Sequence, residues 1–77
     1  MKTSEKLIQA LREELEELLK KIHRLEEFLG SDDLKKNDKE SINLLWDQWS
    51  IMRAYERTLS KRIAHETQKQ YKEGGEK

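Results

Sequence analysis

The sequence of 77 residues has no cysteine, no proline and only three glycines. Without cysteine there is no disulfide framework, no thiolate zinc site and no cysteine nucleophile. No apolar run approaches the roughly 18 residues that a membrane-spanning helix needs, and the first residues lack the apolar core of a signal peptide. We therefore expect a soluble cytoplasmic protein that has no membrane partner.

The sequence also lacks net charge, because sixteen basic side chains balance sixteen acidic ones. This balance removes the usual electrostatic case for a nucleic-acid binder. Charged residues make up 42% of the chain and hydrophobic residues 34%. That mixture is typical of long helices and coiled coils, and the apolar periodicity described next argues against general disorder.

Seven apolar residues in the first third of the chain recur at alternating spacings of three and four. A mean spacing of 3.5 residues places them on one narrow stripe of a helix, as in a coiled coil. We call this set the heptad ladder. Its members are Ile8, Leu11, Leu15, Leu18, Ile22, Leu25 and Leu29.

We predict an all-α fold, an antiparallel two-helix hairpin in a single domain over residues 1–72. The first helix is expected at 4–29, with Ser4 as its N-cap, and the second at 39–71. In the turn at 30–38, Gly30 suits a left-handed helix end, and Asn37 with Glu40 resembles a capping box. Residues 73–77 are predicted to form a disordered tail.

The second helix carries more apolar surface than a hairpin needs. Leu45, Trp49, Met52, Leu59 and Ile63 form the stripe expected to face the ladder. Further apolar residues flank this stripe on both sides, and exposed patches of this kind mark interaction sites. We therefore predict a homo-oligomer, a four-helix bundle or a higher assembly. The expected interface residues are Ile42, Leu44, Trp46, Ile51 and Tyr55.

Two tryptophans and two arginines lie along one edge of the second helix. Indole rings can stack on a base while guanidinium groups bind phosphates, which would suit a nucleotide ligand. Alternatively, both tryptophans are buried at an oligomer interface and Arg53 pairs with a nearby acid. The candidate partner-binding or ligand-binding residues are Trp46, Trp49, Arg53, Tyr55 and Arg57.

The sequence offers no recognisable catalytic arrangement. It has no glycine-rich phosphate loop and no nucleophile elbow. Neither His23 nor His65 belongs to a Glu-x-x-His or His-x-x-x-His pair on its own helix. We expect no enzymatic activity, no cofactor and no metal site.

Several positions in residues 18–63 resemble those of small helical-hairpin proteins encoded by bacteriophages and prophages. The resemblance is carried by Arg24-Leu25, Phe28-Leu29, Ser31, Leu34, Leu44-Leu45, Gln48, Met52, Tyr55, Leu59 and Arg62-Ile63. It implies a phage accessory protein that acts in the cytoplasm of the bacterial host, in host takeover or anti-defence. It brings no catalytic residues with it.

Three hypotheses follow. The first is a protein–protein interaction module that binds and inhibits, or adapts, a host defence component. The second is an oligomeric sponge that sequesters a nucleotide signalling molecule. The third is a structural coiled-coil protein of a phage assembly.

Overall fold

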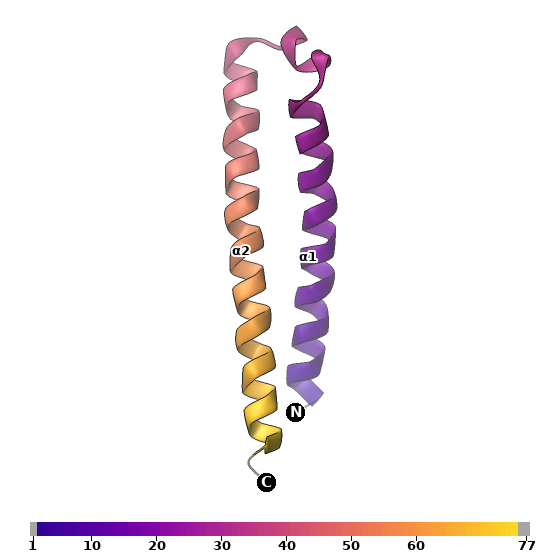
Figure 1. Cartoon of the computed structure of the whole chain (residues 1–77), viewed down its shortest axis with the longest axis vertical. Coiled ribbons are helices and arrows are strands. Elements are labelled where there is room, and N and C mark those ends of the chain that lie inside the picture. The colour runs from indigo at the N-terminus through magenta and orange to yellow at the C-terminus, as the bar shows by residue number, and fades with distance from the viewer. Residues whose placement is uncertain (1, 76–77) are drawn as a thin grey trace.

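The protein is an antiparallel hairpin of two long helices, as the sequence predicts. The computed structural model describes the backbone of residues 2–75 and the side chains of residues 5–70. Helix α1 spans Lys2–Leu29, the short 3₁₀ helix η1 spans Asp32–Lys36, and α2 spans Lys39–Gly75. The first and last described residues lie at one end of the rod and η1 at the other (Figure 1). The molecule measures 60 × 15 × 15 Å.

Both helices are longer than predicted. Helix α1 begins at Lys2, two residues before the expected start at 4. Helix α2 continues to Gly75, so residues 73–75 of the predicted disordered tail are helical. Residues 76–77 of that tail lie outside the described residues.

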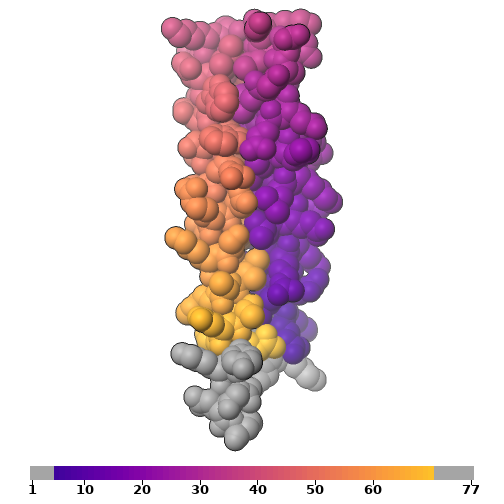
Figure 2. Space-filling model, viewed as in Figure 1, coloured from indigo at the N-terminus to yellow at the C-terminus, as the bar shows by residue number. Residues whose placement is uncertain are grey.

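The core is the heptad ladder packed against α2, and the side chains of the two helices meet along the rod (Figure 2). Five ladder residues, Ile8, Leu11, Leu18, Ile22 and Leu29, are buried. Leu15 and Leu25 are half-buried. Leu59 of α2 has no exposed surface and joins the cluster formed by Leu11, Leu18 and Ile22.

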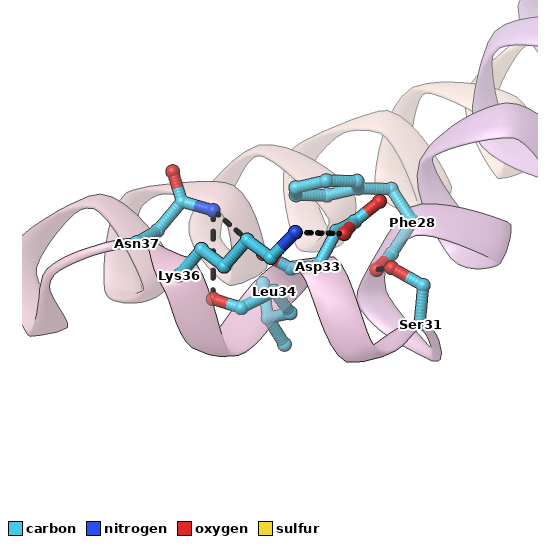
Figure 3. A network of polar contacts seen from close by, with 6 residues as sticks. All are labelled: Phe28, Ser31, Asp33, Leu34, Lys36 and Asn37. Atoms are coloured by element: carbon cyan, nitrogen blue, oxygen red, sulfur yellow. Dashed lines mark hydrogen bonds and ion pairs between the residues drawn. The ribbon is translucent and has the colours of Figure 1, made fainter.

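Polar contacts stabilise the end of α1 and the short helix η1 (Figure 3). The Ser31 hydroxyl donates to the Phe28 carbonyl at 2.7 Å. Lys36 pairs with Asp33 at 3.1 Å within η1. The expectation of a left-handed Gly30 is wrong, because no described glycine has a positive φ.

The residue that caps α2 is Asp38, so the prediction of Asn37 is wrong. The Asp38 carboxylate accepts hydrogen bonds from the Ser41 hydroxyl at 2.7 Å and from the Ser41 amide at 3.3 Å. These two bonds hold the pKa of Asp38 below its ordinary value. Asn37 instead closes η1, because its side-chain amide donates to the carbonyls of Asp33 and Leu34.

Among residues 5–70, five large apolar side chains remain exposed: Leu19, Leu44, Trp46, Ile51 and Tyr55. Four of them lie on α2. A search of the described residues finds no helix long and apolar enough to cross a membrane.

Candidate functional site

The two tryptophans and two arginines singled out in the sequence lie along one side of α2. At about 100° per residue, Trp46, Trp49, Arg53 and Arg57 project within about 80° of one another. We call these four residues, with Glu26 of α1, the aromatic edge. The straight helix holds them in a row, so the spacing read from the sequence carries over directly into space.

Trp46 and Trp49 form an edge-to-face pair. Their ring centroids are 5.8 Å apart and the ring planes meet at 79°, which is a favourable arrangement for two aromatic rings. Trp46 is 46% exposed, whereas Trp49 is half-buried. The rings line a shallow depression of about 230 Å³ together with Glu26, Leu29 and Gly30. Part of the Trp46 indole is therefore accessible to a ligand.

A hydrogen bond across the hairpin fixes Trp49. Its indole N–H donates to Oε2 of Glu26 at 2.9 Å. Because the acceptor belongs to the other helix, this bond links α2 to α1 at that level. The Glu26 carboxylate gives the depression one negatively charged wall.

The two arginines differ in their surroundings. Arg53 pairs with Glu56 at 3.0 Å, one turn along the same helix. The interpretation of the two tryptophans as oligomer-interface residues predicted such a pairing. Arg57 is exposed and forms no ion pair with residues 5–70. Arg57 is therefore the arginine of this edge that is better placed to bind an anion.

Tyr55 does not belong to the aromatic edge. It lies nine residues after Trp46, which is about 180° around the helix. Its hydroxyl donates to Oε2 of Glu14 on α1, and this bond to a carboxylate raises the pKa of Tyr55 above its ordinary value. Together with Leu44 and Ile51, which are 58% and 68% exposed, Tyr55 forms a second side of α2 that we call the aliphatic edge.

The predicted interface set is therefore divided between two sides of the hairpin. Leu44, Ile51 and Tyr55 lie on the aliphatic edge. Trp46 lies on the aromatic edge, and the half-buried Ile42 projects to the same side as Trp46.

Sequence reasoning missed the contribution of α1 to both edges. Glu26 and Glu14 accept hydrogen bonds from Trp49 and Tyr55, and Leu19 is 41% exposed. Leu19 directly follows a ladder residue, and this position signals a flank of the apolar stripe. Nothing in the sequence around the two glutamates indicates their role, because which residue of α2 they contact depends on the register of the hairpin.

Within the part of the chain that the structure describes, no group of three or more His, Cys, Asp or Glu side chains could hold a metal ion.

The fold and its edges define the class of this protein, an all-α helical hairpin with an aromatic pair of which one ring, Trp46, is exposed. A family model described as Sequestin matches residues 5–65. The chain therefore belongs to the Sequestin family. The match includes the heptad ladder, the turn and both edges. The comparison with curated proteins and that with solved structures returned no match.

Proposed function

We propose that this protein is a non-enzymatic, bacteriophage-type sequestering protein that binds a nucleotide signalling molecule at the aromatic edge. The observation that carries the proposal is the exposed Trp46 ring beside Trp49 over a depression. The name of the Sequestin family fits a protein that withholds a ligand or partner.

The aromatic edge has a polarity that suits a nucleotide. A base stacks on Trp46, an interaction worth roughly 1–3 kcal/mol per base. Oε1 of Glu26 accepts a hydrogen bond from an amino group of the base, because Oε2 is engaged with Trp49. Arg57 lies about 16 Å further along the helix axis than Trp46 at about 1.5 Å per residue, and its extended side chain binds a distal phosphate of the ligand. The carboxylate of Glu26 disfavours the reverse orientation, in which phosphate would lie in the depression.

Sequestration requires tight binding and no turnover. Over residues 5–70 the rod, 15 Å across, presents two shallow depressions, whereas enzymes need an enclosed, preorganised site. The proposed activity therefore lowers the free concentration of the signalling molecule and leaves its bonds intact.

A screen of signalling nucleotides by thermal shift and tryptophan fluorescence tests this function. We expect at least one nucleotide to raise the melting temperature and to change indole emission. Calorimetry should then show at least tenfold weaker binding for Trp46→Ala and for Arg57→Ala. Arg24→Ala, at an exposed position on α1, is the matched control and should bind like the wild type. Equal affinity of the Arg57→Ala variant, or no response to any nucleotide, would overturn the proposal.

A second candidate function is the inhibition of a host defence protein in the bacterial cytoplasm. It is favoured by the exposure of Leu44 and Ile51 on the aliphatic edge. In this case one host protein co-purifies with the wild type and is lost with Ile51→Glu, while no nucleotide binds. Recovery of the protein in purified virions would instead favour a structural role in phage assembly.

A further inference from the structure

The outward side of α2 carries a symmetric row of side chains centred on Ile51. Glu40 and Arg62 lie eleven residues before and after Ile51, and Leu44 and Thr58 lie seven residues before and after it. At about 100° per residue, these five positions project within about 40° of one another. We call them the α2 row.

The charges of the α2 row differ between its two halves. Glu40 lies at the start, and the neighbouring Asp47 adds a second carboxylate to the first half. Arg62 lies near the other end. All three are exposed, and within residues 5–70 none of them forms an ion pair. The face is therefore complementary to itself only when a second copy runs in the opposite direction.

We propose that the α2 row binds the α2 row of a second copy of this chain, antiparallel, with the two-fold axis at Ile51. In this register the two Ile51 side chains meet. Glu40 lies opposite Arg62 of the second copy, and Leu44 lies opposite Thr58. The two-fold symmetry forms each of these pairs twice. The interface therefore contains two Glu40–Arg62 ion pairs and buries Leu44 of both copies.

The shape of the surface is compatible with this register, and its size is that of a weak interface. A depression of about 510 Å³ lies over the first turns of α2, lined by Lys39, Glu40, Asn43, Leu44 and Asp47. The two-fold axis places Thr58 and Arg62 of the second copy over it. From Glu40 to Arg62 the row is about 33 Å long at ~1.5 Å per residue. A single helix with its side chains is about 10–12 Å across, so each copy contributes roughly 350 Å², and the total of roughly 700 Å² is the size of a weak, transient dimer interface.

The proposed dimer leaves both aromatic edges outside the interface. Of the predicted interface residues, Leu44 and Ile51 lie at its centre, Tyr55 lies at its margin, and Trp46 and Ile42 are excluded. The dimer thus presents two separate ligand surfaces. The proposal does not rest on nucleotide binding, and either one can fail without the other.

Cysteine cross-linking tests the direction and the register, because the natural chain contains no cysteine. Ile51→Cys places two thiols at the axis, within the Cα separation of about 7 Å that a disulfide allows. Leu44→Cys is the matched control, since its two copies lie about 21 Å apart along the antiparallel pair at ~1.5 Å per residue. We expect mild oxidation to cross-link Ile51→Cys and not Leu44→Cys. Cross-linking of both variants alike, or of neither, would overturn the proposal.

A charge exchange tests the ion pairs by sedimentation equilibrium. Glu40→Arg and Arg62→Glu should each raise the dimer dissociation constant at least tenfold, because each places like charges opposite one another. The double variant should recover most of the wild-type affinity, whereas Arg24→Glu on α1 should have no effect. A wild type that is monomeric at high micromolar concentration, or a double variant no better than the single ones, contradicts the proposed interface.

Discussion

Replacement of Leu59 with alanine tests the packing of the hairpin most severely. Leu59 has no exposed surface and contacts the buried cluster of Leu11, Leu18 and Ile22. Removal of a fully buried leucine side chain costs the transfer free energy and leaves a cavity, together about 3 kcal/mol within a usual range of 2–5. A chain of this size has roughly 4–12 kcal/mol of total stability. The substitution should therefore remove a quarter of that stability or more.

Chemical denaturation followed by circular dichroism at 222 nm measures this loss. In a thermal melt followed at the same wavelength, the melting temperature should fall by roughly 12–24 °C, at about 4–8 °C per kcal/mol for a small domain. Leu19→Ala is the matched control, because Leu19 is 41% exposed, and it should cost less than about 1 kcal/mol. Equal losses for the two variants, or an unaffected Leu59→Ala, would refute the assignment of Leu59 to the core.

Three further predictions concern the polar contacts. Asp38→Ala removes the cap of α2 and should lower the melting temperature by a few degrees. The folded state lowers the pKa of this carboxyl below its ordinary value of about 3.8. Its stabilising contribution is therefore present above pH about 3.8 and is lost as the pH falls through the folded-state pKa. The raised pKa of Tyr55 means that tyrosinate absorbance at 295 nm should develop at higher pH in the wild type than in Glu14→Gln. The stability from that bond is complete below pH about 10 and is lost as the pH rises through the folded-state pKa. Glu26→Ala leaves the Trp49 indole without its acceptor and should cost about 1 kcal/mol, measured by urea denaturation.

Each of these predictions has an outcome that contradicts it. An Asp38→Ala protein that melts like the wild type would mean that the Ser41 contacts do not stabilise α2. If the wild type and Glu14→Gln titrate at the same pH, the hydrogen bond from Tyr55 to Glu14 does not form in solution. The control for Glu26→Ala is Glu27→Ala. Equal stability of these two variants would show that the hydrogen bond from Trp49 to Glu26 contributes nothing to the free energy of unfolding.

The architecture could be predicted because it follows from periodicity. Seven apolar residues at a mean spacing of 3.5 specify one buried stripe, and five of them are buried. The same projection places Trp46 and Tyr55 on opposite flanks of α2, and the hydrogen bonds of Trp49 and Tyr55 to α1 agree with that division.

The details of the helix ends and the contacts between the helices could not be predicted. Asn37 and Asp38 are adjacent residues that both favour capping positions, so composition alone does not choose between them. The structure chooses Asp38 because Asn37 is used to close η1. Contacts such as Trp49 with Glu26 depend on how far one helix slides along the other. The length and shape of the turn set that register, and no local pattern in α1 records it.

The most direct test of the proposed function is the recovery of the ligand after binding. The protein is mixed with the nucleotide that gives the largest thermal shift, free and bound fractions are separated by ultrafiltration, and the bound fraction is released by heat. Sequestration predicts that the free nucleotide is depleted in proportion to the protein added and is then recovered chemically unchanged. Recovery of a cleaved or modified nucleotide, or no depletion at a protein excess, would contradict the account.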